Sequence, residues 1–287
     1  MTSYQVTREI VLSNGALLPT VGLGTYYLPP KKTAETVTQA LTKGYRHIDT
    51  AVLYNNEEEV AQGIADWIGL DPQNLRLDVF YTTKLWDMDG GYTAVRREIA
   101  RCVRKMTAYG LEYIDLLLIH SPLCGSRKRL ECWRAMQEAV DAGTVKSIGV
   151  SNYGVHHIQE LLAWPKLTHK PVVNQIEISP WCMRQELADW CRQQGIVVEA
   201  YAPLTHGYKT EDSALKAIAE KHSVSTAQVL IRWSLQHGYV PLPKTQTIGR
   251  LSGNVDVYRF ELSDEELATI DHPEAHEPTD WECTEAP

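Results

Sequence analysis

Four side chains that can exchange protons stand at or just after the ends of three apolar segments. Asp49 ends the first segment and Tyr54 lies in the turn after it. Lys84 and His120 come directly after the second and third segments, at intervals of 35 residues from Asp49 to Lys84 and 36 from Lys84 to His120. Each interval fits one strand, one helix and two loops, so parallel strands would bring these side chains to one edge of a sheet.

These residue types suit the reduction of a carbonyl group. A free tyrosine has a pKa of about 10 and is a poor acid at neutral pH. A nearby ammonium favours the phenolate, so we expect Lys84 to lower the pKa of Tyr54, with Asp49 pairing with Lys84 and fixing it. His120 can orient a carbonyl oxygen through a hydrogen bond. Together they form a donor set for the oxyanion that develops when a hydride reaches a carbonyl carbon.

The rest of the chain alternates short apolar strands with amphipathic helices. Several strands are continuously apolar, as expected for a parallel sheet covered on both faces. The pattern predicts an α/β protein, a (β/α)8 TIM barrel formed by residues 1–287 as one domain, with an N-terminal β-hairpin at 9–18 capping the bottom and additional C-terminal helices. Strands are expected at 21–25, before Asp49, and at 78–83, 114–119, 145–150, 172–176, 196–200 and 239–242. Helices are expected at 33–43, 57–68, 92–109, 129–142, 155–163, 184–194, 211–221, 225–237, 249–256 and 263–271.

Composition and charge limit the partners and ligands that we expect for this protein. The formal net charge is −8 and no basic tract stands out, so we expect no nucleic-acid partner. No apolar run approaches the roughly 20 residues that span a bilayer, which argues against a membrane partner. The six cysteines are scattered without a Cys-x-x-Cys pair, which predicts reduced thiols, a cytoplasmic location and no metal site. We expect a monomer.

Several motifs resemble those of the aldo-keto reductase family, in family order along nearly the whole chain. They are residues 44–51, 53–57, 83–86, 115–120, 149–152, 174–177 and 243–244. The resemblance implies that Tyr54 is the general acid, that Lys84 and Asp49 tune it, and that His120 orients the carbonyl. It also implies a small-molecule carbonyl substrate and an alcohol product.

The resemblance further implies a nicotinamide cofactor held on the rim of the barrel. The chain lacks the Gly-x-Gly-x-x-Gly fingerprint of a Rossmann fold, so the family's own site is the relevant one. There Ser151, Asn152 and Gln175 would bond the nicotinamide carboxamide. Tyr201 would stack on the ring, since an aromatic face suits a planar heterocycle.

The other end of the cofactor would meet a cationic cluster. Lys244, Thr245 and Arg250 match the family's clamp for a 2′-phosphate, and two cations with a hydroxyl suit that dianion. By the same resemblance Asn254 would contact the adenine and backbone amides near Leu204 would hold the pyrophosphate. We therefore expect NADPH rather than NADH.

The substrate is expected to meet an apolar wall. Tyr27, Leu53 and Trp86 would crowd the side of the site away from the cofactor, and Trp281 lies in a tail that can fold over the barrel mouth in this family. Such a wall favours bulky or aromatic carbonyl compounds over open-chain sugars, whose hydroxyls would stay unpaired.

Other interpretations remain open at this point. Trp86 and Tyr201 could be core aromatics, Lys244 and Arg250 could be an ordinary solvated pair, and Trp281 could be a tail residue without a role. An imine or enone reductase on the same scaffold is one alternative function, although relatives that reduce steroid enones carry Glu at the position of His120. A cofactor-binding regulatory subunit without turnover is another. The four proton-exchanging residues and the lack of an added N-terminal docking segment favour the enzyme.

Overall fold

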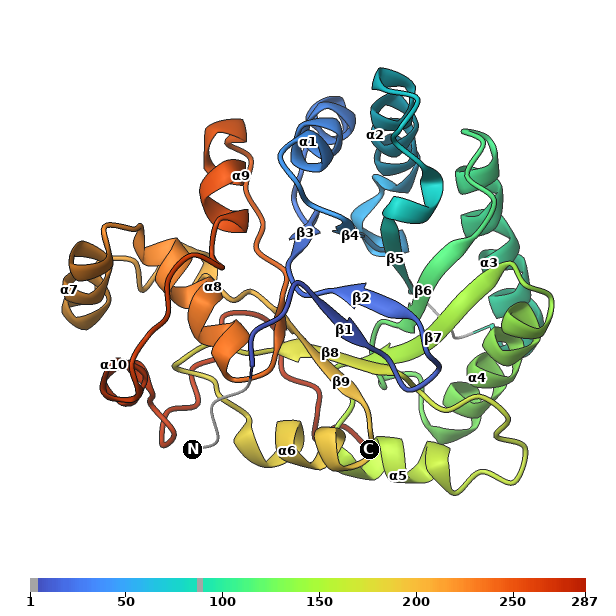
Figure 1. The fold of residues 1–287 in the computed structure, drawn as a ribbon. Helices are drawn as coiled ribbons and strands as arrows, with labels where there is room; N and C mark the ends of the chain where they lie inside the picture. The colour runs from blue at the N-terminus through green and yellow to red at the C-terminus, as the bar shows by residue number, and fades with distance from the viewer. Residues whose placement is uncertain (1–4, 87–89) are drawn as a thin grey trace.

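The computed structural model describes residues 5–86 and 90–287, and its centre is a barrel of eight strands (Figure 1). Neighbouring strands pair in parallel from β3 at one end of the sheet to β10 at the other. The predicted (β/α)8 fold is therefore confirmed. The strands are β3 Gly22–Gly24, β4 His47–Asp49, β5 Phe80–Leu85, β6 Ile114–Ile119, β7 Val145–Ser151, β8 Val173–Glu177, β9 Val197–Tyr201 and β10 Val240–Pro241.

Helices surround the barrel and follow the predicted alternation. Their buried side chains pack against the outward faces of the strands in one large apolar core. The helices are α1 Pro30–Thr42, α2 Glu57–Leu70, α3 Gly91–Thr107, α4 Ser126–Asp141, α5 Val155–Leu162, α6 Gln185–Gln193, α7 Ser213–His222, α8 Thr226–Gln236, α9 Ile248–Val255 and α10 Asp264–Ile270. Short 3-10 turns occur at Val52–Tyr54, Arg76–Asp78 and Thr205–Gly207.

Two glycines let the first and last strands of the barrel approach each other. A Cβ atom on Gly22 would lie 2.5 Å from the Leu242 side chain, and one on Gly24 would lie 3.0 Å from the Leu242 carbonyl oxygen. The Gly24 amide donates to the carbonyl oxygen of Pro243 at 3.1 Å. The small residues of β3 thus allow the contact that closes the barrel.

The N-terminal hairpin covers one end of the barrel, as predicted. It consists of β1 Glu9–Val11 and β2 Leu17–Pro19, which pair antiparallel. Leu12 and Leu18 are buried in a second apolar cluster with side chains from inside the barrel: Phe80, Leu116, Leu118, Val172, Val173 and Val240. The hairpin therefore keeps these side chains from water.

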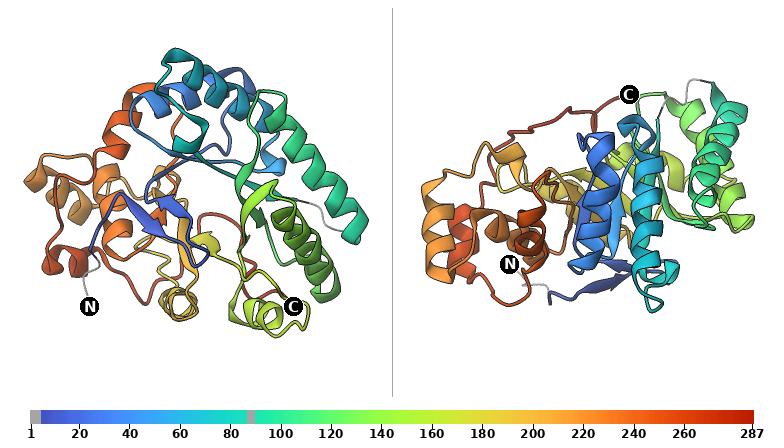
Figure 2. Two further views of the ribbon diagram at one scale, coloured as in Figure 1. Left: turned by 45° about the vertical axis from the view of Figure 1, so that its right-hand side comes forward. Right: turned by 90° about the horizontal axis from the view of Figure 1, so that it is seen from above.

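The C-terminal tail crosses the opposite end of the barrel. The right-hand view of Figure 2 shows the hairpin and the tail at opposite ends of the molecule. This arrangement leaves the carboxyl ends of the strands facing the tail, which is where active sites lie in barrels of this kind.

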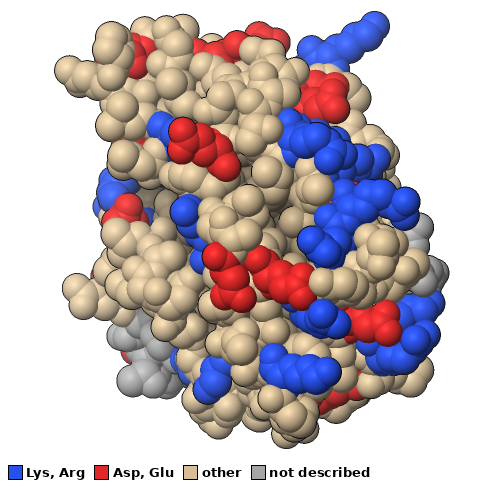
Figure 3. All heavy atoms as spheres, turned by 90° about the vertical axis from the view of Figure 1, so that its right-hand side faces the viewer, with Lys and Arg blue, Asp and Glu red and all other residues tan. Residues whose placement is uncertain are grey.

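The outer face over α3 and α4 carries charges of both signs (Figure 3). Arg101 lies 2.6 Å from Glu98, and Arg127 and Arg134 pair with glutamates one helical turn further on. Exposed pairs of this kind add little to stability, but they keep this face from having one sign of charge. Among the described residues, no helix is long and apolar enough to cross a membrane.

Candidate active site

The carboxyl ends of the strands open into a pocket of about 1080 Å³. Asp49 ends β4, Tyr54 ends the 3-10 turn after it, and His120 follows β6 directly. All three line the pocket. Lys84 was expected just beyond a strand ending at 83; it lies within β5 instead, because the strand pairs with β6 through Leu85.

Lys84 is the centre of this group. Its side chain is fully buried, and its ammonium donates to Asp49 Oδ1 at 2.6 Å, to the carbonyl oxygen of Thr50 at 2.9 Å and to Tyr54 Oη at 3.3 Å. A buried charge is tolerated when it is paired and hydrogen-bonded in this way. The contacts fix the ammonium beside the phenol.

The pKa of Tyr54 departs from the sequence prediction. Burial, followed by the carboxylates of Asp49 and Asp280, raises the pKa of the Tyr54 phenol well above its usual value. The expected lowering of this pKa by Lys84 is wrong for this structure, because burial and the two carboxylates all act to raise it. The phenol thus keeps its proton at neutral pH, which is the form that a general acid needs.

His120 faces Tyr54 across the pocket floor. Their ring centroids are 5.7 Å apart, in an edge-to-face arrangement. Burial, and after it the Lys84 ammonium, holds the pKa of His120 well below its usual value. The imidazole is therefore neutral and has one N–H to donate, and its Nδ1 has no hydrogen-bond partner among the described residues.

Four residues predicted to hold the nicotinamide form one wall beside this group. Ser151, Asn152 and Gln175 are buried and line the pocket. The Tyr201 hydroxyl donates to Asn152 Oδ1 at 2.9 Å, so the Tyr201 ring is held along the same wall. Planar, buried and polar groups together fit a planar ring that carries an amide.

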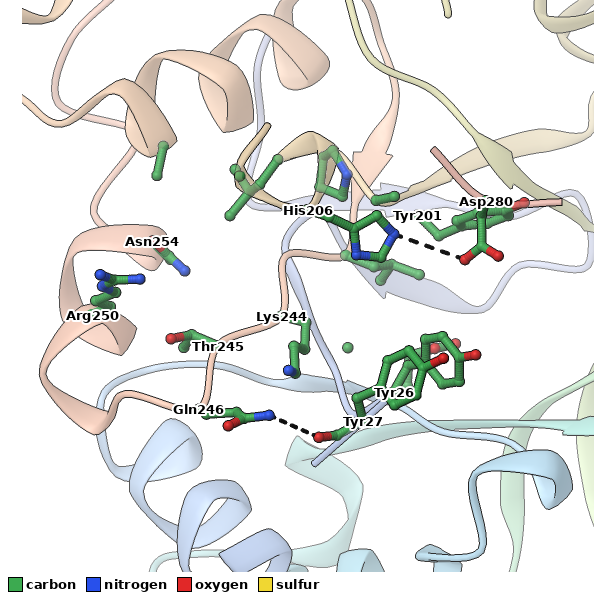
Figure 4. Close-up of a pocket in the computed structure, with 18 of the residues that line it drawn as sticks. Tyr26, Tyr27, Tyr201, His206, Lys244, Thr245, Gln246, Arg250, Asn254 and Asp280 are labelled. Atoms are coloured by element: carbon green, nitrogen blue, oxygen red, sulfur yellow. Dashed lines mark hydrogen bonds and ion pairs between the residues drawn. The ribbon is translucent and has the colours of Figure 1, made fainter. Parts of the chain in front are cut away.

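The predicted phosphate-binding residues cluster at the other end of the pocket (Figure 4). Lys244, Thr245, Arg250 and Asn254 all line it, as does Leu204 on the loop after β9. Burial lowers the pKa of Lys244, as is usual for an amine that is partly removed from water. The pocket thus has a cationic end and a polar end, which fits a long molecule with a phosphate at one terminus.

Aromatic side chains form a third wall of the pocket. Trp86 lies 5.1 Å from His120 and 5.4 Å from Trp281, measured between ring centroids. Leu53 and Tyr27 stand at the rim, and Tyr27 is 67% exposed. The tail residue Trp281 therefore lines the pocket beside His120, with ring centroids 6.2 Å apart, rather than standing apart from the barrel.

A buried carboxylate ties down the tail that carries Trp281. Glu177, at the end of β8, accepts hydrogen bonds from the amide and hydroxyl of Thr279 at 2.5 and 2.7 Å and from the Asp280 amide at 3.1 Å. Glu177 is only 1% exposed. A charge-assisted contact of this kind fixes where residues 279–281 lie.

Sequence reasoning missed three residues of the site. Tyr26, rather than Tyr27, packs beside Tyr54, with ring centroids 4.8 Å apart. Asp280 lines the pocket and lies 3.9 Å from His206, and Glu199 is buried inside the barrel. Of these three, only Glu199 could have been noticed from the sequence, because it is a charged residue within the otherwise apolar segment 196–200.

Comparison with known proteins agrees with this geometry. The model of the Aldo/keto reductase family matches residues 20–274. The chain belongs to the aldo/keto reductase family. An uncharacterised oxidoreductase of Saccharomyces cerevisiae is 61% identical over 98% of this chain and 100% of its own. Glyoxal reductase of Bacillus subtilis is 41% identical over 91% of each chain. The structure of Bombyx mori aldo-keto reductase in complex with NADP superposes with a TM-score of 0.85, at 34% identity over 93% of each chain.

Membership of the aldo/keto reductase family makes the chain one of a group of oxidoreductases that use nicotinamide cofactors. The described residues contain no cluster of His, Cys, Asp and Glu arranged to hold a metal ion. The donor groups identified above are protein groups: a phenol, an ammonium and an imidazole.

Proposed function

We propose that this aldo/keto reductase reduces an aldehyde or ketone to an alcohol with NADPH, with Tyr54 as the general acid. The observation that carries the proposal is the contact of the Tyr54 hydroxyl with Lys84 Nζ at 3.3 Å, while Asp49 holds that ammonium at 2.6 Å. This pairing gives the pocket a protonated phenol in its lining, with a fixed positive charge buried directly behind it.

Each residue has a separate role in this mechanism. His120, as a neutral imidazole, donates a hydrogen bond to the carbonyl oxygen and orients it. NADPH supplies the hydride when it is bound. Tyr54 gives its proton to the oxygen as negative charge develops there, and the Lys84 ammonium stabilises the phenolate left behind. Asp49 keeps Lys84 charged and in place.

We assign the cofactor as NADPH from the residues of the cationic end. Lys244, Thr245 and Arg250 would hold the 2′-phosphate, and Asn254 would contact the adenine. Backbone amides near Leu204 would hold the pyrophosphate. Ser151, Asn152 and Gln175 would bond the carboxamide, and Tyr201 would stack on the ring. The NADP complex of the silkworm relative supports this choice.

We assign the substrate as an uncharged, bulky or aromatic carbonyl compound. Trp86 and Trp281 offer it apolar surface, with Leu53 and Tyr27 at the rim. The Asp280 carboxylate lies close enough to Tyr54 to raise its pKa, so an anionic substrate would meet repulsion there. His120 favours carbonyl reduction over enone reduction, as stated above for the family.

A panel of aldehydes, ketones, imines and enones with NADPH and with NADH tests this proposal. We expect loss of NADPH absorbance with aldehydes and ketones, fastest with neutral aromatic aldehydes. Turnover of imines or enones alone would contradict the assignment. Cofactor binding without turnover of any substrate would favour a regulatory role.

A further inference from the structure

A second buried carboxylate lies behind the active site and takes no part in the mechanism above. Glu199 is in the middle of β9, and its side chain is fully buried. Its Oε2 accepts a hydrogen bond from Gln175 Nε2 at 2.8 Å, while its Oε1 has no partner within hydrogen-bond distance among the described residues. A buried carboxyl with one partner is costly, which raises the question of what that one contact does.

The contact completes the hydrogen bonding of the Gln175 amide nitrogen. Gln175 Nε2 donates to Asp49 Oδ2 at 2.9 Å as well as to Glu199. A side-chain amide has two N–H donors, and both are now taken. The reversed amide would point its oxygen at two carboxyl oxygens, so this orientation is the one that the chemistry allows. Gln175 can then offer the pocket only its carbonyl oxygen.

We propose that Glu199 is a positioning residue that, together with Asp49, presents Gln175 Oε1 to the pocket as an acceptor for the carboxamide N–H of the cofactor. The inference rests on the proposed function, in which Gln175 bonds the carboxamide.

A carboxyl group suits this role in either protonation state. Burial, and after it the charge of Asp49, raises the pKa of Glu199 to about 8. When the group is protonated, the proton belongs on Oε1, which has no other partner, so that Oε2 still accepts from Gln175 in either state. Two other titratable groups act near Glu199. His47 Nε2 lies 3.8 Å from Glu199 Oε1 and instead meets Thr82 Oγ1 at 3.0 Å, and the Lys84 ammonium opposes the rise in the pKa of Glu199.

The test compares binding of NADP⁺ with binding of its 3-acetylpyridine analogue, in which a methyl group replaces the carboxamide nitrogen. The wild-type protein should bind NADP⁺ roughly three- to tenfold more tightly, the range expected for one hydrogen bond. Glu199→Leu should bring the two affinities within about twofold of each other, because Gln175 loses the partner that orients it. Glu199→Gln keeps an acceptor oxygen and should restore the wild-type ratio.

A merely structural role for Glu199 would weaken both ligands alike and leave the ratio unchanged, which would overturn the proposal. If Glu199→Leu fails to fold, the wild-type protein still gives an answer. Both side-chain amide protons of Gln175, assigned by their loss in Gln175→Glu, should be protected from solvent exchange in NMR spectra. Rapid exchange of either would contradict the proposal. Failure of the wild-type protein to bind either ligand would instead contradict the proposed function.

Discussion

The protonation of Tyr54 depends on a competition between nearby groups. The sequence identified the ammonium that would favour phenolate, and the structure adds burial and the carboxylates of Asp49 and Asp280, which favour the neutral phenol. The balance leaves a protonated acid beside a cation that can stabilise its conjugate base. That arrangement suits proton donation better than a phenolate would.

Replacing Arg250 should separate the two nicotinamide cofactors. Arg250 lines the cationic end of the pocket, so Arg250→Ala should weaken NADPH binding by about 1.5–3 kcal/mol, as for a lost hydrogen bond to a charged group. NADH, which lacks the 2′-phosphate, should bind almost unchanged. Titration calorimetry would measure the affinities for both cofactors. Arg259→Ala is the matched control, because Arg259 pairs with Asp256 outside the pocket. Equal losses for the two cofactors would show that Arg250 does not contact the phosphate.

Asp280→Asn should relax discrimination against anionic substrates. The substrates 4-nitrobenzaldehyde and 4-carboxybenzaldehyde are similar in shape and differ in charge. Two unit charges about 4 Å apart in water interact by about 1 kcal/mol, and Asp280 is partly exposed to solvent, so the variant should gain roughly threefold to tenfold in relative kcat/KM for the carboxylate. Glu274→Gln, an exposed tail carboxylate outside the pocket, is the control. An unchanged ratio in Asp280→Asn would remove Asp280 from substrate selection.

At the scale of elements, the alternation of apolar strands and amphipathic helices predicted the barrel. The spacing of apolar residues and the positions of turn residues can be read within a short stretch of sequence, without knowledge of distant contacts. Strand 114–119 was predicted at its observed bounds, and strand 78–83 was displaced by two residues toward the N-terminus. The position of the tail over the barrel mouth was suggested only by the family resemblance, because the pattern of the sequence itself does not give it. It depends on contacts of Glu177 with residues 102 and 103 positions further along, and sequence pattern does not encode such distant pairs.

Releasing the tail should affect bulky substrates most. Glu177→Gln weakens the charge-assisted contacts that hold Thr279 and Asp280, so Trp281 should lose its place over His120. We expect kcat/KM for a bulky aromatic aldehyde to fall roughly tenfold, the scale of one such hydrogen bond, while a small aldehyde changes little. Glu285→Gln, at an exposed position in the tail, provides the control. A uniform loss for both substrates, or none, would show that the tail does not form the substrate wall.

At the scale of the whole molecule, the barrel encloses titratable groups whose protonation is linked to stability. Burial lowers the pKa of His47 to about 3 and raises that of Glu199 to about 8. The folded protein therefore binds a proton at Glu199 more tightly than the unfolded chain does. Stability linked to Glu199 must fall as pH rises from about 4.5 to about 8 and stay level above that.

A glutamine at position 199 should remove this dependence. Glu199→Gln mimics the protonated acid, so its Tm should be close to that of the wild-type protein near pH 5 and higher than it above pH 8. One pKa unit corresponds to about 1.4 kcal/mol, so the full effect is at most about 5 kcal/mol. The contribution of His47 has the opposite sign and acts between its folded pKa of about 3 and its usual value of 6.5, so it does not change above pH 8, where the comparison is decided. A constant difference in Tm would mean that Glu199 does not titrate differently in the folded protein.

The most direct test of the account is Tyr54→Phe, measured as a single turnover of enzyme-bound NADPH with a neutral aromatic aldehyde. The substitution removes the proton donor and keeps the ring. Loss of one positioned acid typically costs about 10²–10⁴-fold in rate, so the hydride-transfer step should slow by that factor. Affinity for NADPH should stay within about twofold, since Tyr54 acts on the substrate oxygen and loses no hydrogen bond to the cofactor. Hydride transfer at the wild-type rate in the phenylalanine variant would contradict the central claim.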